Sequence, residues 1–242
     1  MDNLFGEFMG TMVLIVFGAG VCANMSLNKS KGQGGGWICI AVGWGFAVTL
    51  GVFTATTLGA PQGDLNPAVT LAKCMAGIYT PGQFIATSAA QLVGAILGAT
   101  IVWLAYLPHW AETPDPATKL GVFATGPAIR SAGANFLCEA IATFFLMFVI
   151  WMIFSKPVGA LVPGYGPYIV GVLIWALGLS LGGPTGYAMN PARDLGPRIA
   201  HAILPIAGKG GSDWGYAWVP IAGPLVGGAI AYVVANACGV LG

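Results

Sequence analysis

The chain has 242 residues, of which 57% are hydrophobic and only 7% are charged, and its formal net charge is +1. Soluble domains carry about 25% charged residues, so this composition indicates a membrane protein. Because the sequence contains no basic or acidic block, it offers no electrostatic footprint for nucleic acid or another polyanion.

Six long apolar segments predict membrane-spanning helices, each long enough for the ~20 residues that a span requires. In chain order they cover residues 4–23, 37–58, 81–107, 134–154, 161–183 and 214–240. Residues 108–133 form a proline-rich connection in the middle of the chain. We therefore expect a single transmembrane domain over residues 1–242, with half-repeats 1–110 and 131–242 joined by a linker at 108–133.

The two halves resemble each other in sequence. Glu7 with Thr11 in the first segment matches Glu139 with Thr143 in the fourth, and residues 92–95 match residues 225–228. Three spans per half is an odd number, so a tandem repeat must insert its second half upside down. Such inverted repeats place the functional site between the halves, near the middle of the membrane.

One tripeptide occurs twice between these spans, as Asn66-Pro67-Ala68 and as Asn190-Pro191-Ala192. Asn is a favoured helix N-cap and Pro is tolerated at the first helical position, so each copy predicts a helix start. Residues 69–77 are too few to cross a bilayer, and we expect Gly196 and Pro197 to interrupt the second helix early. The sequence predicts two half-helices that enter from opposite sides, with their positive dipole ends meeting near the middle.

The segments 63–70 (GDLNPAVT) and 186–198 (GYAMNPARDLGPR) resemble the major intrinsic protein family, the aquaporins and aquaglyceroporins. The resemblance extends over nearly the whole chain. One Asn-Pro-Ala could be an ordinary capped helix, but two copies within an inverted repeat are not explained in that way. The resemblance implies an all-α membrane protein with six transmembrane helices and two re-entrant half-helices in an inverted repeat.

Three features resemble the glycerol facilitator branch of that family. Asp194 directly follows the second Asn-Pro-Ala-Arg, and Gly178 stands where water-selective members have a bulky His. Trp44 falls where glycerol facilitators place a filter Trp, although the stretch from it to Asn66 is slightly longer than usual. The resemblance implies a selectivity filter of Trp44, Gly178, Tyr187 and Arg193.

The chemistry of these side chains suits a polyol, which has a carbon face and a hydroxyl face. Trp44 and Tyr187 offer aromatic surface, and Arg193 offers hydrogen-bond donors. An Arg inside a membrane costs at least ~2.5 kcal/mol and usually marks a pathway. The alternatives are an Arg193 that extends to the interface, and aromatic residues that only pack or form an interfacial belt.

Asn66 and Asn190 have a second expected role. Their side-chain NH₂ groups can point into the lumen and donate to a passing oxygen. Two donors and two positive helix ends at one level disfavour cations, including hydronium. The alternative for each Asn is a plain N-cap without lumen contact.

Glu7 and Glu139 are carboxylates within spans, which are costly unless paired. Re-entrant loops expose backbone N–H groups that need acceptors, so we expect both to support those loops. We expect Asp194 to pair with nearby backbone or with Arg198. A proton relay through Glu7 and Glu139 is the alternative, and it would make the protein a coupled transporter.

Two residues and the charge bias depart from the family pattern. Asp64 stands where most members have His and adds a carboxylate to one pore mouth, where it could favour the adjacent positive helix end. Tyr187 replaces the Phe usual in glycerol facilitators. With both termini inside, as the family implies, one cation (Lys156) lies in an inside loop and five lie outside, opposite to the positive-inside expectation. The outside cations are Lys29, Lys31, Lys119, Arg130 and Lys209.

The sequence thus predicts a passive channel for small uncharged solutes, chiefly glycerol with some water, in the cell membrane. The resemblance implies a homotetramer with one pore per subunit. We expect no enzyme and no cofactor. The alternatives are the same channel favouring undissociated lactic acid, dihydroxyacetone or hydrogen peroxide, a proton-coupled symporter, and a structural junction protein with a closed pore.

Overall fold

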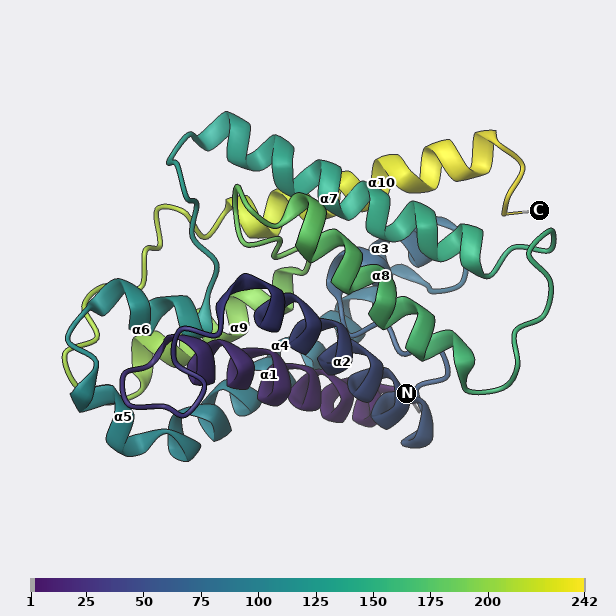
Figure 1. Cartoon of the computed structure of the whole chain (residues 1–242). Coiled ribbons are helices and arrows are strands. Elements are labelled where there is room, and N and C mark those ends of the chain that lie inside the picture. Colours follow the sequence, from purple (N-terminus) through teal and green to yellow (C-terminus); the bar gives the residue numbers. More distant parts are fainter. Residues whose placement is uncertain (1–2, 242) are drawn as a thin grey trace.

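The computed structural model describes residues 3–241, which form a bundle of ten helices (Figure 1). Their bounds are α1 Leu4–Ser26, α2 Gly36–Thr57, α3 Pro67–Met75, α4 Pro81–Ala105, α5 Leu107–Glu112, α6 Pro116–Phe123, α7 Ala132–Ile153, α8 Tyr165–Leu181, α9 Pro191–Ile203 and α10 Val219–Ala237.

Six of these helices correspond to the six predicted spans. Helices α1, α2, α4, α7 and α10 are long and apolar enough to cross a membrane. Helix α8 is apolar but has only 17 residues, roughly 26 Å of helix against a hydrocarbon core of ~30 Å. The prediction started α8 four residues too early, because residues 154–164 form a loop that ends in Gly164 with φ +82°.

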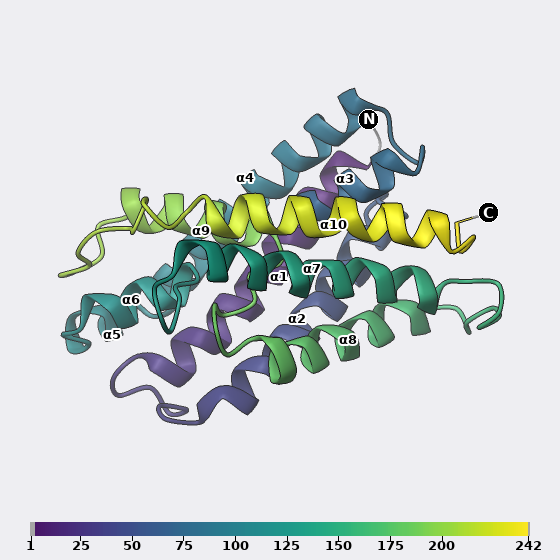
Figure 2. The same ribbon diagram turned by 90° about the horizontal axis from the view of Figure 1, so that it is seen from above.

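The half-helices α3 and α9 point toward opposite ends of the bundle (Figures 1 and 2). Helix α3 packs against α10 and α4, whereas α9 packs against α4 and the short helix α6. Their first residues, Pro67 and Pro191, meet in the middle of the molecule, where the Asn before each Pro is the N-cap.

The prediction that Gly196 and Pro197 interrupt the second half-helix early is wrong. Helix α9 continues through both residues to Ile203. Pro197 removes only the hydrogen bond that its N–H would donate to the carbonyl of Arg193, and its fixed φ is compatible with a helix. Gly196 serves packing instead, because a Cβ there would lie 2.6 Å from the Cβ of Ala95 in α4. At 13 residues, α9 is still too short to span a bilayer.

Glycines bring the long helices into close contact in both halves. A Cβ on Gly94 of α4 would lie 2.2 Å from the carbonyl oxygen of Phe8 in α1. A Cβ on Gly227 of α10 would lie 2.2 Å from the carbonyl oxygen of Ala140 in α7. These two glycines occupy matching positions in the repeated segments 92–95 and 225–228, so the same close approach occurs twice.

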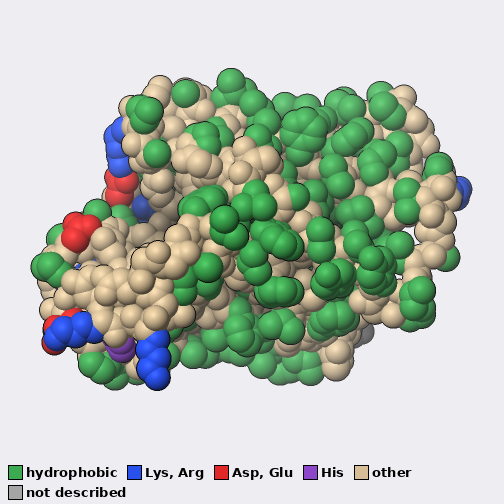
Figure 3. Space-filling view, in the orientation of Figure 1, with side chains coloured by type: hydrophobic (Ala, Val, Ile, Leu, Met, Phe, Trp, Pro, Cys, Tyr) green, Lys and Arg blue, Asp and Glu red, His purple; other side chains and the backbone are tan. Residues whose placement is uncertain are grey.

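The central connection is folded rather than extended. It contains α5 and α6, and α6 packs against α1 and α9. Figure 3 shows apolar side chains over most of the visible surface, with charged side chains gathered at the end that carries α5 and α6. A broad apolar belt of this kind suits a bilayer.

Candidate functional site

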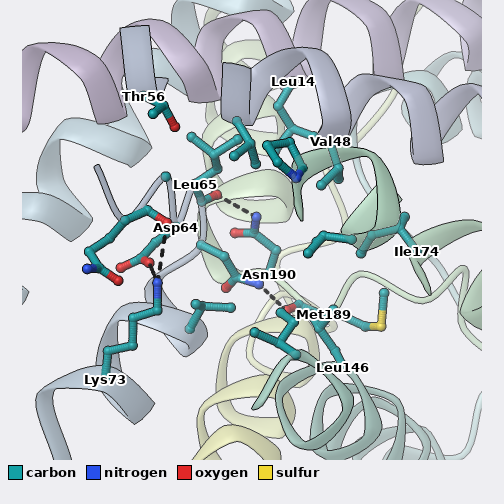
Figure 4. Close-up of a pocket in the computed structure, with 18 of the residues that line it drawn as sticks. Leu14, Val48, Thr56, Asp64, Leu65, Lys73, Leu146, Ile174, Met189 and Asn190 are labelled. Atoms are coloured by element: carbon teal, nitrogen blue, oxygen red, sulfur yellow. Dashed lines mark hydrogen bonds and ion pairs between the residues drawn. The ribbon is translucent and has the colours of Figure 1, made fainter. Parts of the chain in front are cut away.

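A cavity of about 590 Å³ lies between the two halves, and residues of both line it (Figure 4). Thr56 and Trp44 both line it from α2, twelve residues and thus roughly 18 Å apart along the helix axis. Asp64 and Lys73 belong to its Thr56 end, and Arg193 belongs to its Trp44 end. The cavity is therefore elongated along the bundle.

Asn66 and Asn190 lie in the wall of this cavity and hold the two halves together. The Nδ2 of Asn66 donates to the carbonyl oxygen of Met189 at 2.8 Å, and the Nδ2 of Asn190 donates to that of Leu65 at 2.7 Å. Each Oδ1 accepts from its own helix start, at Ala68 N and Ala192 N. Since each NH₂ carries two hydrogens, one donor per Asn is left for the cavity.

The accepting carbonyls belong to residues in an unusual conformation. Leu65 has φ +53° and Met189 has φ +48°, both in the left-handed region that side chains other than Gly rarely adopt. A conformation of this kind persists only when surrounding interactions impose it.

Glu7 and Glu139 supply such interactions. The Glu7 carboxylate accepts the N–H groups of Asp64 and Leu65, both at 2.8 Å. The Glu139 carboxylate accepts those of Ala188 and Met189, at 3.0 and 2.9 Å. In each half, a fully buried carboxylate thus binds the two residues that precede the Asn N-cap.

Three of the four residues expected in a filter line one end of the cavity. The guanidinium carbon of Arg193 lies 3.9 Å from the centre of the Trp44 ring, a cation–π stack. Gly18 of α1 makes room for that ring, because a Cβ there would lie 2.3 Å from it. The indole N–H of Trp44 donates to the Cys22 Sγ at 3.4 Å.

Gly178 does not line the cavity. It contacts Tyr187, which does line the cavity. A Cβ on Gly178 would lie 2.7 Å from the Tyr187 hydroxyl oxygen. Trp37 contacts the Tyr187 ring edge-on at 5.7 Å and donates its indole N–H to the Gly178 carbonyl at 2.8 Å. The missing side chain at position 178 therefore provides the space that Tyr187 fills.

Asp194 and Arg198 form a fully buried ion pair on α9, with Nη2 of Arg198 2.7 Å from Oδ1 of Asp194. The Thr125 N–H donates to the Asp194 carboxylate at 2.7 Å, and Arg198 donates to the Thr125 carbonyl at 2.9 Å. Neither charge lines the cavity. The pair fastens the central connection to the half-helix.

Asp64, expected at a pore mouth, forms an ion pair with Lys73. Its other carboxylate oxygen accepts from Thr70 Oγ1 at 3.0 Å, and Lys73 also donates to the Gln62 carbonyl at 3.3 Å. Figure 4 shows Lys73 extended from α3 toward Asp64. The expectation that Asp64 acts by itself on the adjacent helix end omitted this partner.

Sequence reasoning assigned no role to several residues that contact the expected site, among them Lys73, Trp37, Phe123 and Thr125. Lys73 did carry a signal, since it is the one charged residue of the first half-helix. Phe123, whose carbonyl accepts from Arg193 at 3.5 Å, and Thr125 lie in a connection without a motif. Only the fold brings them to α9.

Comparison with known proteins agrees with this geometry. A family model described as "Major intrinsic protein" matches residues 1–234. The chain belongs to the major intrinsic protein family. A family member from Lactiplantibacillus plantarum named "Glycerol uptake facilitator protein 3" is 54% identical over 234 residues, which cover 97% of this chain and 95% of that protein.

Two further matches extend the comparison. A "D/L-lactic acid transporter" from the same species is 43% identical over 235 residues, covering 96% of this chain and 95% of that protein. The X-ray structure of the aquaglyceroporin from Plasmodium falciparum superposes with a TM-score of 0.86 at 28% identity, covering 99% of this chain and 98% of that one. The chain is thus a multi-pass membrane protein of the aquaporin-like fold, in a family of channels.

Proposed function

We propose that this major intrinsic protein is a passive channel for small uncharged solutes, with glycerol as its main solute and water as a second. One observation carries the proposal. The cavity between the halves runs past both Asn side chains and ends at an arginine stacked on a tryptophan. The glycerol facilitator that is 54% identical along nearly its full length supports glycerol as the solute.

The filter of the channel consists of Trp44, Gly178, Tyr187 and Arg193. The Trp44 and Tyr187 rings offer a surface for the carbon face of a polyol, and Arg193 donates to its hydroxyl groups. Gly178 acts indirectly, by leaving the space that Tyr187 occupies. Within residues 3–241, the Tyr187 hydroxyl is buried and has no hydrogen-bond partner.

The middle of the channel favours neutral solutes. Two half-helix N-termini and the free Asn66 and Asn190 donors face one level of the cavity. Positive helix ends and N–H donors attract oxygen lone pairs and repel cations, which excludes hydronium.

We infer that transport is uncoupled and involves no catalytic step. Glu7 and Glu139, the candidates for a proton relay, each already accept two backbone N–H groups of a re-entrant loop. Protonation would turn one oxygen of such a carboxylate into a donor, and the backbone N–H that this oxygen accepts would lose its partner. This favours loop support over a proton-coupled symporter.

A second candidate is the same channel conducting undissociated lactic acid. The 43% identical relative named as a lactic acid transporter favours it. Dihydroxyacetone and hydrogen peroxide are further small neutral solutes that the same geometry would admit.

We further propose that the halves 1–110 and 131–242 are inverted repeats and that four subunits assemble in the cell membrane with their termini inside. Four of the five cations at the end with α5 and α6 bind structural partners. Lys29 pairs with Glu112 and Arg130 with Asp213, while Lys119 and Lys209 donate to backbone carbonyls. These local contacts explain the cations at the end with α5 and α6 without reference to how the chain inserts into the membrane.

The test is stopped-flow light scattering of proteoliposomes that contain the purified protein. We expect glycerol flux above that of empty liposomes, unchanged when a protonophore collapses the proton gradient. Larger polyols, water, and lactic acid at low pH complete the solute series. Absence of any solute flux would contradict the proposal and favour a closed junction protein.

A further inference from the structure

The Asp64–Lys73 ion pair differs from the Asp194–Arg198 ion pair of the other half-helix, because it lies in the wall of the proposed solute pathway. Both residues line the cavity, and Asp64 precedes the Asn66 N-cap by two positions. The Asp64 side chain is 0% exposed and that of Lys73 is 12% exposed. The pair is therefore accessible to solutes from the Lys73 side.

The charge balance at this end of the cavity depends on Lys73. The Asp64 carboxylate receives one cationic partner, Lys73, and one neutral donor, Thr70. A second carboxylate, that of Glu7, accepts the Asp64 backbone N–H. Glu7 is fully buried and is not among the residues that line the cavity. Without the Lys73 ammonium, the Asp64 carboxylate in the cavity wall would therefore keep no cationic partner among the described residues.

A single uncompensated charge in a narrow, partly dehydrated mouth acts strongly on ions. Charges lining a cleft with low-dielectric walls concentrate counter-ions within it. An unpaired Asp64 would therefore hold cations at the mouth, and an unpaired Lys73 would hold anions. Either ion would obstruct a neutral solute that must pass the same place.

We propose that Lys73 is a specificity-determining residue of this channel. Its ammonium group neutralises Asp64 in the pathway wall, so that the mouth has no net charge and neutral solutes pass without competition from ions. The inference rests on the proposed channel function and adds to it a residue outside the filter and outside both Asn-Pro-Ala motifs.

The experiment measures glycerol flux into proteoliposomes with and without a divalent ion at about 10 mM on both sides, where screening by the salt is still weak. The variants are Lys73→Met, Asp64→Asn and the double variant with both changes. We expect magnesium ions to slow flux through Lys73→Met, and sulfate ions to slow flux through Asp64→Asn. The loss should be about two- to fivefold, the size of one partly solvated charge pair.

The double variant decides between a charge effect and a structural one. It restores neutrality without restoring the ion pair, so its flux should respond to neither ion, like that of the wild type. If Lys73→Met and the double variant respond equally to magnesium, Asp64 is not the source of the effect and the proposal is wrong. The proposal also fails if neither single variant responds to salt.

Two controls separate other causes. Lys29→Met removes the cation of a lysine–carboxylate pair outside the cavity, with side chains 72% and 47% exposed, so its flux should not respond to magnesium. Lys73→Gln keeps a hydrogen-bond donor and replaces Lys73→Met if that protein does not fold. If the wild type conducts no glycerol, the proposed channel function is wrong. If the wild type and both single variants conduct glycerol without a response to salt, only the proposal for Lys73 is wrong.

Discussion

The two re-entrant loops are held by the same kind of contact, a buried Glu, but the Asp beside each half-helix pairs with its cation in a different setting. In both halves a buried Glu accepts the two N–H groups before the Asn N-cap. Residues 64–65 donate to Glu7, and residues 188–189 donate to Glu139. The acid–base pairs differ. Asp194 and Arg198 are both 0% exposed and four residues apart on one helix, whereas Asp64 and Lys73 join a loop to a helix at the cavity.

This difference separates a pair buried within the bundle from a pair in the wall of the cavity. Arg198 also donates to the carbonyls of Thr125 and Ser212, so the second-half pair ties three segments together away from solutes. Within the part of the chain that the structure describes, Lys73 donates to Asp64 and to the neighbouring Gln62 carbonyl. We therefore expect changes in the second-half pair to affect stability, and changes in the first-half pair to affect selectivity.

Of the changes considered, Arg198→Met should lower the stability of the protein most strongly. It leaves the Asp194 carboxylate buried without a cation, and breaking a buried pair in this way costs about 3–5 kcal/mol. We expect a large fall in the midpoint of thermal unfolding, measured on the purified protein in detergent. Arg130→Met is the matched control, because its pair with Asp213 is exposed and should contribute little.

The feature that the two halves share, a Glu that binds the loop before the Asn N-cap, is tested by Glu7→Gln and Glu139→Gln. Each replaces a carboxylate that accepts two adjacent N–H groups by an amide with a single acceptor oxygen. One buried N–H then lacks its partner, at a cost of about 1–3 kcal/mol. We expect similar falls in the unfolding midpoint for both variants. Clearly unequal falls would show that the mirrored contacts do not support the two loops equally.

Gly178→Ala tests the proposed filter, to which the two halves contribute different residues. Trp44 comes from the first half, whereas Gly178, Tyr187 and Arg193 come from the second. An added Cβ at 178 would lie 2.7 Å from the Tyr187 ring and hydroxyl, so the ring must move toward the pathway. We expect glycerol flux to fall about tenfold, equivalent to ~1.4 kcal/mol, with a smaller effect on water. An unchanged ratio of glycerol to water flux would contradict this filter.

The sequence was sufficient for features that depend on local pattern. Apolar length located the six spans, and Asn followed by Pro located both half-helix starts, because caps are a local property of the backbone. The partners of Asp64 and Asp194 were harder to predict from the sequence. Arg198 follows Asp194 by one helical turn and could be expected, whereas Lys73 reaches Asp64 only because the chain folds back after the loop.

The course of α9 and the role of the central connection required the fold. Pro197 ordinarily ends or kinks a helix, but contacts of α9 with α4 and α6 support the helix beyond it. Thr125 carries no motif, and its bond to Asp194 exists because α6 packs on α9. Long-range contacts of this kind leave no periodic signal in one sequence.

Lys209→Met should have the smallest effect and sharpens the comparison between two lysines. Lys209 caps the end of α9, where its ammonium group donates to the carbonyls of His201, Ala202 and Leu204 at 2.6–2.8 Å. A cation at a helix C-terminus contributes about 0.3–1 kcal/mol, so the unfolding midpoint should fall by only a few degrees.

Lys209 does not line the cavity, so glycerol flux through Lys209→Met should respond to neither magnesium nor sulfate. Lys209→Arg keeps the charge and should recover most of the lost stability. Lys73 and Lys209 are then two cations near the ends of two half-helices that differ in partner and in position. Lys73 pairs with a carboxylate in the cavity wall, whereas Lys209 binds backbone carbonyls away from the cavity. A salt response in Lys209→Met equal to that of Lys73→Met would remove that distinction, because position in the cavity wall would no longer explain which charge governs selectivity.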